Sequence, residues 1–365
     1  MHTSIIHQIR AWSTCAEPGI PIDEGGRAIR VLDLFCGGGG SSFGARAAGA
    51  EIACGVDAWN TALSNYSSNF PNAVAKNQRL EEICPSQLRD EIGDVDILLT
   101  SPECTNHTCA KGSAPRSEES RATALETLRY ASTFEPEWII LENVVHMRPW
   151  SRYGELKDEL RRLGYYVLEQ TLDASLFGVA QRRRRLFLIC CKSGLPQMDF
   201  HFRRKKRIVS DILDERGSWK TSALNSNNRS RATLERAERA FAELGYDEPF
   251  LIVYYGSDGS GGWQPLNRPL RTITTVDRFA LVERVDGEHR MRMLQVPELS
   301  RAMGFTSKYK FTDGTRRDKV KILGNGVCPP VMKEIVKAAL AQNSSPSDLA
   351  PQHDLVREND LMTTE

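Results

Sequence analysis

The sequence predicts an α/β fold: a doubly wound, mostly parallel sheet with a smaller second domain. Apolar, strand-like runs alternate with helical stretches from about residue 28 to 195, as in βαβ units. The four glycines Gly37 to Gly40 directly follow the first of these runs. After Ser193 the sequence becomes polar and basic, and it resembles α/β sequence again only from Lys319. The length of 365 residues suits about two domains.

The expected elements of the first domain follow one another without long interruptions. We expect a buried strand at 29–35, which the glycine run ends, and a helix at 41–50 that a serine caps. The remaining expected elements are strand 51–56, helix 59–70, strand 94–100, helix 118–134, strand 138–141, helix 153–163, strand 165–172 and strand 186–190.

Shifts in composition suggest where the domains begin and end. Residues 1–27 are polar and contain two prolines and three glycines, so we expect a flexible lead-in. Residues 28–195 and 316–342 form the expected α/β domain, with a helix within 319–340 returning to it. Residues 196–315 form the expected second domain, and 343–365 a disordered tail. Within the second domain we expect an amphipathic helix at 231–244 and a strand at 250–255.

Composition excludes several classes of protein. A net charge of +1 and 40% hydrophobic residues are typical of a globular chain rather than a disordered one. No run approaches the roughly 18 apolar residues of a membrane span, and the N-terminus lacks the apolar region of a secretory signal. The nine cysteines include no Cys-x-x-Cys pair, so we expect no disulfide framework and no metal site. These features predict a cytoplasmic protein.

One segment is strongly basic. Residues 179–207 contain ten Lys or Arg and one Asp. Such a segment suits a local contact with a polyanion, or it forms a solvated charged face. The charge pattern alone leaves both interpretations open.

The glycine-rich turn suggests a bound cofactor. A ligand can approach its backbone closely at the carboxyl end of a central strand, and Asp57 ends the second strand, where a carboxylate can accept hydrogen bonds from ribose. The Gly-x-Gly-x-x-Gly pattern of dinucleotide sites is not met, because its third glycine would be Ser42 or Phe43. The pattern favours another adenosine-containing cofactor, and a plain glycine-rich turn is the alternative.

Three further groups carry potential chemistry. Cys104 follows the strand at 94–100 and is a candidate nucleophile, because a thiolate is the strongest nucleophile near neutral pH. Glu142 ends the strand at 138–141 and could act as a general acid if burial raises its pKa. Arg183 and Arg185 alternate at the start of a strand and can face one side, toward a phosphate or a carbonyl. A structural cysteine, a surface glutamate and a solvated turn are the alternatives.

In this order the motifs resemble the DNA (cytosine-5)-methyltransferase family from about residue 28 to 341. They are Asp33-x-Phe35-x-Gly37-x-Gly39-Gly40, Pro102-Glu103-Cys104, Arg121-Ala122-Thr123, Glu142-Asn143-Val144, Gln181-x-Arg183-x-Arg185, Arg268-Pro269-x-x-Thr272 and Gly324-Asn325-Gly326-Val327. The family usually has Pro-Pro-Cys, but Ser101-Pro102-Glu103-Cys104-Thr105 is similar to a bacterial and phage branch. A carboxylate at Glu103 that pointed inward would raise the pKa of the thiol. The family often has Asp near Asn77, whose amide oxygen can still accept a hydrogen bond.

The resemblance implies a methyltransferase fold of the S-adenosylmethionine-dependent type with a target-recognition domain at 196–315. It implies that Cys104 attacks carbon 6 of a flipped cytosine in duplex DNA, that Glu142 contacts ring nitrogen 3, that Arg185 contacts the cytosine carbonyl, and that Arg183 steadies the pocket or a phosphate. The implied S-adenosyl-L-methionine site comprises Phe35, Gly37, Gly38, Gly39, Gly40, Asp57, Asn77, Pro102, Asn325 and Val327. The implied DNA contacts are Thr108, Arg121, Gln181, Arg203, Arg204 and Lys205.

The resemblance also implies partners. A monomer on duplex DNA, associated with the nucleoid, is expected, with or without a cognate restriction endonuclease. Two alternatives stay open: a tRNA cytosine-5 methyltransferase, and a DNA-binding regulator whose catalysis is impaired, which only Glu103 favours.

Overall fold

The computed structural model describes residues 27–103, 123–200, 202, 205–255 and 261–343. Five of the expected site residues lie outside these ranges: Cys104, Thr108, Arg121, Arg203 and Arg204. The same holds for the expected lead-in up to residue 26 and for the tail from residue 344.

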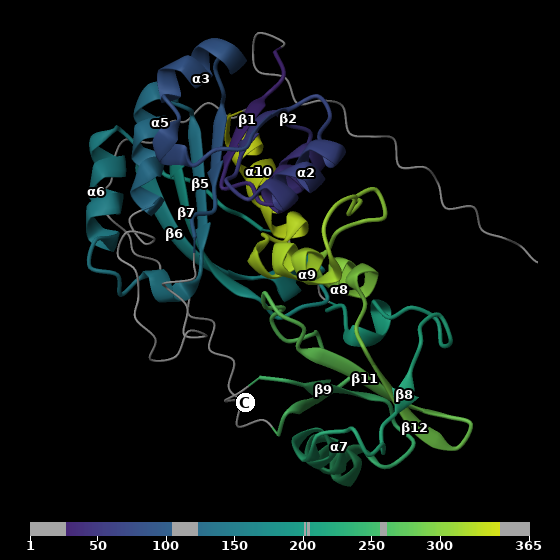
Figure 1. Ribbon diagram of the computed structural model, residues 1–365. Coiled ribbons are helices and arrows are strands. Elements are labelled where there is room, and N and C mark those ends of the chain that lie inside the picture. The colour runs from purple at the N-terminus through teal and green to yellow at the C-terminus, as the bar shows by residue number, and fades with distance from the viewer. Residues whose placement is uncertain (1–26, 104–122, 201, 203–204, 256–260, 344–365) are drawn as a thin grey trace, which may run out of the picture.

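The larger sheet has seven strands in the order β3-β2-β1-β4-β5-β7-β6 (Figure 1). Its strands are β1 Arg30–Leu34, β2 Glu51–Val56, β3 Val74–Lys76, β4 Ile97–Thr100, β5 Trp138–Asn143, β6 Tyr166–Asp173 and β7 Arg184–Cys191. Five neighbouring strands run parallel, and β7 runs antiparallel to both β5 and β6. The expectation of a mostly parallel α/β sheet is therefore confirmed.

Helices cover both faces of this sheet, which makes it doubly wound. Alternating strand residues divide between two cores: Val31 faces one and Leu32 the other, as period-2 geometry requires. One core includes α1 Gly40–Ala47, α2 Asn60–Asn69 and α10 Pro329–Asn343, and the other includes α3 Pro85–Ile92, α5 Glu126–Phe134 and α6 Tyr153–Arg162. Burial of both faces explains why these strands are continuously apolar rather than alternating.

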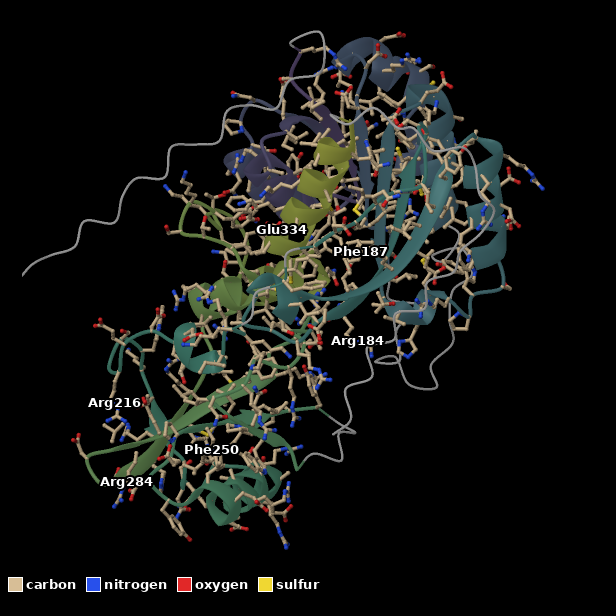
Figure 2. The ribbon with its side chains drawn as sticks, turned by 180° about the vertical axis from the view of Figure 1, so that it is seen from behind. Arg184, Phe187, Arg216, Phe250, Arg284 and Glu334 are labelled. Atoms are coloured by element: carbon tan, nitrogen blue, oxygen red, sulfur yellow. The ribbon has the colours of Figure 1, made fainter. Side chains whose placement is uncertain are left out.

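A second, antiparallel sheet forms the smaller domain, with the order β10-β9-β11-β12-β8 (Figure 1). Its elements are β8 Ser222–Ala223, α7 Arg231–Leu244, β9 Phe250–Val253, β10 Trp263–Pro265, β11 Phe279–Val285 and β12 Glu288–Met293. Helix α7 packs on one face through Ala237 and Ala240, and has the bounds expected from its amphipathic pattern. Figure 2 marks Phe250 in this sheet and Phe187 in the larger one.

Helices α8 Val296–Met303 and α9 Arg316–Asn325 connect the two sheets. The segment between them lies on α2 of the larger domain, where Asn65 binds the backbone of Thr312 and Asn69 that of Lys310. These contacts differ from the expected domain boundary at residue 315. We propose that the smaller domain ends before α8, because the chain already belongs to the larger domain there.

Three local expectations were wrong or incomplete. No serine caps α1: its N-cap is Gly39, in the left-handed conformation. The expected helix within 319–340 is interrupted near Gly326, so that α9 and α10 are separate, although α10 does return to α1. Strand β3 and helix α3 were not expected, because β3 has three half-buried residues and α3 only eight residues in all. Within the described ranges, no helix is long and apolar enough to cross a membrane.

Candidate active site

The carboxyl edge of the larger sheet gathers the expected site residues. Strands β1, β4 and β5 are neighbours and run parallel, so the segments that follow them meet at one edge. The amide of Ser101 donates to the carbonyl of Leu34 at 3.2 Å, which joins the segments after β4 and β1. Cys104 comes directly after the last described residue of this segment, Glu103.

Asn143 joins the end of β5 to the same segment. Its side-chain Nδ2 donates to the carbonyl of Pro102 at 3.2 Å, while its Oδ1 accepts from the amide of Val144 at 2.8 Å. Asn143 and Pro102 are both buried. One strand end therefore fixes both Glu142 and the chain that leads to Cys104.

The glycine loop after β1 lies in very little space. Gly39 has φ +84°, and a Cβ atom there would lie 2.5 Å from the Phe70 ring. A Cβ atom on Gly40 would lie 2.4 Å from the carbonyl oxygen of Val327, because the start of α1 packs directly on the α9–α10 junction. These positions require glycine, and they leave the backbone of the loop close to any ligand at this edge.

Asp57, at the end of β2, holds the glycine loop. Its Oδ2 accepts from the amide of Gly37 at 2.8 Å and its Oδ1 from the amide of Trp59 at 2.7 Å. Burial raises the pKa of Asp57, and these two amides and the charge of Lys321 oppose that rise. A carboxylate has about four lone-pair sites, so Asp57 can still accept from the hydroxyls of a ribose. Asn77 donates to the Asp57 carbonyl at 3.0 Å, which keeps it at the same corner.

Asp33 lies beneath the loop and has no exposed surface. Its Oδ2 accepts from the amide of Ser42 at 3.2 Å and from the Ser42 hydroxyl at 2.6 Å, and these bonds take the place of the expected serine cap. Burial raises the pKa of Asp33 to about 7. Asp33 therefore fixes the first turn of α1 from inside the core.

Glu142 and Arg185 form an ion pair at the edge. Arg185 Nε lies 3.1 Å from Glu142 Oε1, and the two side chains are 16% and 8% exposed. The antiparallel strand β7 begins at this edge, at Arg184, which Figure 2 labels, so it carries Arg185 to Glu142. Burial raises the pKa of Glu142, and the charges of Arg185 and Arg183 oppose that rise. A small cavity beside the pair is lined by Leu172, Phe187, Cys328 and Val331 among others.

Gln181 and Arg183 have internal partners. The Arg183 guanidinium donates to the carbonyls of Ile273, Gly324 and Gly326 at 3.1, 2.9 and 3.0 Å. Gln181 accepts from the amide of Ile273 at 2.8 Å and has no exposed surface. The Gln181 side chain is enclosed in this structure, and its expected contact with DNA stays a prediction.

The remaining expected residues lie either near the glycine loop and Asp57, a region called the cofactor corner below, or at the surface. Phe35 has φ +55° and is half-buried beside the glycine loop. Val327 is buried against Gly40, and Asn325, at the end of α9, is exposed. Lys205 is exposed, as a phosphate contact requires. In the described ranges, no group of three or more His, Cys, Asp or Glu could hold a metal ion.

Sequence reasoning missed three side chains at this site. Asn143 belongs to a motif that was noticed, yet no role was assigned to it. The Lys321 ammonium lies 4.2 Å from the centre of the Trp59 ring, beside Asp57. The Tyr309 hydroxyl donates to the Gly38 carbonyl. No local pattern could reveal the last two contacts, because each joins residues more than 200 positions apart.

Comparison with known proteins decides the family. The model of the C-5 cytosine-specific DNA methylase family matches residues 29–341. The chain belongs to this family. It is a DNA (cytosine-5-)-methyltransferase, and it methylates cytosine in DNA with S-adenosyl-L-methionine as methyl donor.

Curated relatives are similar over most of the methyltransferase. Type II methyltransferase M1.BsuMI from Bacillus subtilis is 26% identical over 334 residues, which cover 82% of this chain and 78% of that protein. Type II methyltransferase M.HgiDI from Herpetosiphon aurantiacus is 26% identical over 303 residues, covering 82% of this chain and 90% of that protein.

Solved structures share the fold at lower identity. A Spodoptera frugiperda DNMT2 variant superposes with a TM-score of 0.63 and 18% identity, covering 85% of this chain and 99% of that one. Dnmt2 methyltransferase from S. pombe gives a TM-score of 0.59 at 17% identity, over 86% of this chain and 98% of that one.

The cofactor corner of this methyltransferase fits S-adenosyl-L-methionine. Asp57 holds the amide of Gly37 and has further lone pairs that could accept from ribose hydroxyls, and the Asn77 amide oxygen could accept from an adenine amino group. Of the other expected lining residues, Val327 packs against Gly40 of the loop and Phe35 directly precedes the loop, whereas the placing of Pro102 and Asn325 at the cofactor stays a prediction. The donor and acceptor set therefore suits an adenosine with a short charged side chain.

Proposed function

We propose that this methyltransferase acts on carbon 5 of a flipped cytosine within a specific duplex DNA sequence, through a covalent bond between Cys104 and carbon 6. The observation that carries the proposal is the carboxyl edge of the sheet. There the buried Glu142, paired with Arg185 of β7, lies on the strand end whose Asn143 also holds Pro102, two residues before Cys104.

The groups at this edge suit the chemistry that cytosine needs. Carbon 5 is a poor nucleophile until a bond at carbon 6 and a proton on ring nitrogen 3 redirect electron density to it. The Cys104 thiolate would form the bond to carbon 6, and Glu142 would give the proton to nitrogen 3. S-adenosyl-L-methionine supplies the methyl group that carbon 5 accepts. Solvent water then takes the proton from carbon 5, which breaks the carbon 6–sulfur bond and releases the Cys104 thiolate, and nitrogen 3 returns its proton to Glu142.

The two arginines would have different tasks. Arg185 lies beside Glu142 and is 16% exposed, so it can contact the cytosine carbonyl and hold the acid in place. Arg183 is 2% exposed and binds three backbone carbonyls, so it would steady the pocket from behind rather than contact a phosphate. Extrusion of the base from the duplex costs a few kcal/mol.

The position of Glu103 supports catalysis rather than an inactive DNA-binding role. Its side chain is exposed, and its negative charge contributes to the raised pKa of Asp57. An exposed carboxylate is hydrated, so its charge is screened and disfavours a nearby thiolate less than an inward one would. An impaired regulator therefore has less support than an active enzyme.

DNA contacts would come from Lys205 together with Thr108, Arg121, Arg203 and Arg204. Exposed basic side chains fix a protein on the phosphate backbone, and base edges supply the sequence information. We further propose a monomer that acts at the bacterial nucleoid in the cytoplasm, with or without a cognate restriction endonuclease. The similarity to Type II methyltransferases supports this setting.

A covalent trap tests the proposed nucleophile. DNA that contains 5-fluorocytosine should form a gel-stable complex with the wild type, because fluorine cannot leave carbon 5 as a proton does. Cys104→Ala should abolish this complex and leave noncovalent binding intact. A stable complex with Cys104→Ala would exclude Cys104 as the nucleophile.

Nucleoside mass spectrometry tests the substrate. DNA and tRNA from a methylation-free host that expresses the wild type should contain new 5-methyldeoxycytidine in DNA only, and none with Cys104→Ala. Methylcytidine in tRNA alone would instead identify a tRNA methyltransferase, the alternative substrate.

A further inference from the structure

The segment between α8 and α9 is fixed to α2 by two asparagines. Asn65 Oδ1 accepts from the amides of Thr312 and Asp313 at 2.8 and 3.2 Å. Asn69 pairs with both peptide groups of Lys310, accepting at 2.9 Å and donating at 2.8 Å. The two asparagines lie four residues apart and therefore on one face of the helix. Because both are buried, the segment has a fixed path across the larger domain.

This path places Tyr309 above the glycine loop. Its ring packs on Phe43 of α1 and on Phe305, with centroid distances of 5.5 and 4.3 Å. Its hydroxyl donates to the carbonyl of Gly38, and a Cβ atom on Gly38 would lie 2.8 Å from that hydroxyl. Burial raises the pKa of Tyr309, so the hydroxyl remains a donor at every ordinary pH.

Two neighbouring loop residues are thus each held by a side chain from another segment of the chain. Asp57 binds the amide of Gly37, and Tyr309 binds the carbonyl of Gly38. Rotation of the peptide planes here would break one bond or the other. A loop rich in glycine has many alternative conformations, so these two bonds select one of them.

We propose that Tyr309 is a positioning residue for cofactor binding: its hydroxyl holds the Gly38 peptide in the orientation that binds S-adenosyl-L-methionine. The proposal rests on the cofactor of the family and does not depend on the proposed covalent step at Cys104. Its failure and the failure of that step are therefore distinguishable.

Loss of the hydroxyl should weaken cofactor binding by a defined route. In Tyr309→Phe the ring still fills its site, but the buried Gly38 carbonyl loses its donor. The loop then leaves the binding conformation more often. The apparent Kd for the cofactor rises as the fraction of enzyme whose loop has the binding conformation falls. A fall to about one tenth gives an about tenfold higher Kd, which corresponds to about 1.4 kcal/mol.

The test compares two tyrosines in the intact enzyme. Tyr165 is also buried, and its hydroxyl donates to the Pro136 carbonyl at 2.7 Å, next to the start of β6 at the opposite edge of the sheet. Isothermal calorimetry with S-adenosyl-L-methionine should give an about tenfold higher Kd for Tyr309→Phe and a Kd within about twofold of wild type for Tyr165→Phe. The KM for the cofactor should rise in parallel, whereas kcat at saturating cofactor and the Kd for DNA should change by less than about twofold.

A chemical rescue completes the test. Tyr309→4-aminophenylalanine restores a donor at the same position and should return the cofactor Kd to within about threefold of wild type. An unchanged cofactor Kd in Tyr309→Phe would overturn the proposal. So would an equal weakening of cofactor and DNA binding with a lowered Tm, because that pattern indicates a general loss of structure.

Discussion

Glu142 is the residue whose environment matters most for the proposed chemistry. Burial favours its neutral form, while Arg185 at 3.1 Å and Arg183 behind it favour the charged form. The net direction is a raised pKa. A carboxyl group poised in this way can give a proton to a ring nitrogen and recover it afterwards.

This environment predicts a pH dependence. The fraction of Glu142 that carries a proton falls as pH rises through its raised pKa, so the single-turnover rate of the wild type should fall on that side. Glu142→Gln cannot give a proton, so its rate should be lower by about 10²–10⁴-fold and should not show that fall. Rapid-quench assays from about pH 5 to 9, at saturating DNA and cofactor, measure both. A glutamine variant with the wild-type rate, or with the same fall, would contradict the role.

Individual residues were predictable where the partner lies at the same edge of the sheet. Glu142, Arg185 and Asp57 end or begin strands, and strand order alone puts them at one edge of the sheet, where Glu142 and Arg185 are neighbours. Gln181 and Arg183 bind partners near Ile273 and Gly324 that lie about 90 and 140 positions away in the sequence. No pattern in the sequence predicts contacts of that length, so the internal hydrogen bonds of Gln181 and Arg183 could not be expected.

At the scale of elements, the contact between α1 and the α9–α10 junction fixes the glycine loop that precedes α1. Gly40 begins α1 directly beneath the carbonyl of Val327, and Gly44 lies against the backbone of Pro329. Helix α10 comes from the end of the described chain, yet it packs against the first helix. The cofactor loop therefore depends on both ends of the domain.

Gly40→Ala should disturb this contact. The new Cβ would lie 2.4 Å from a backbone oxygen, so α1 or the junction must move, at a cost of about 1–3 kcal/mol in the free energy of unfolding. Gly154→Ala in α6 is the matched control, because a Cβ there meets no atom within 4 Å and should be neutral or stabilise by up to about 1 kcal/mol. Chemical denaturation measures both. Equal stability of the two variants would contradict the prediction, because it would mean that the α9–α10 junction moves away from the new Cβ at no cost in free energy.

The alternating elements of the larger domain were predictable because their strands are long apolar runs. Strand β3, with three half-buried residues, lacks that signal. The sheet of the smaller domain was mostly missed, because β8 and β10 have two and three residues and their strands pair antiparallel across loops. We propose that the segment after α8 belongs to the larger domain, because Asn65 and Asn69 hold it there, and no sequence pattern predicts these tertiary contacts.

At the scale of the whole molecule, charge is balanced overall and uneven locally. The chain has a net charge of +1, yet residues 179–207 contain ten Lys or Arg. Part of that excess is internal, because Arg183 binds carbonyls and Arg185 binds Glu142. The exposed remainder, including Lys205, is available for phosphates. DNA binding should therefore depend on a small number of local contacts rather than on net charge.

A small number of phosphate contacts predicts a measurable salt dependence. Roughly six contacts imply an about thousandfold loss of affinity for duplex DNA between about 50 and 200 mM salt, because each contact releases counterions. Lys205→Ala should weaken binding to every sequence and reduce the slope of log Kd against log salt by about one.

Arg162→Ala is the matched control. This arginine is 72% exposed at the end of α6, just before β6 begins at the opposite edge of the sheet, so its removal should leave the slope unchanged. Fluorescence anisotropy with labelled duplexes gives all three slopes. A flat response in the wild type would mean that phosphates contribute little, and an equal effect of the two substitutions would remove Lys205 from the DNA-binding surface.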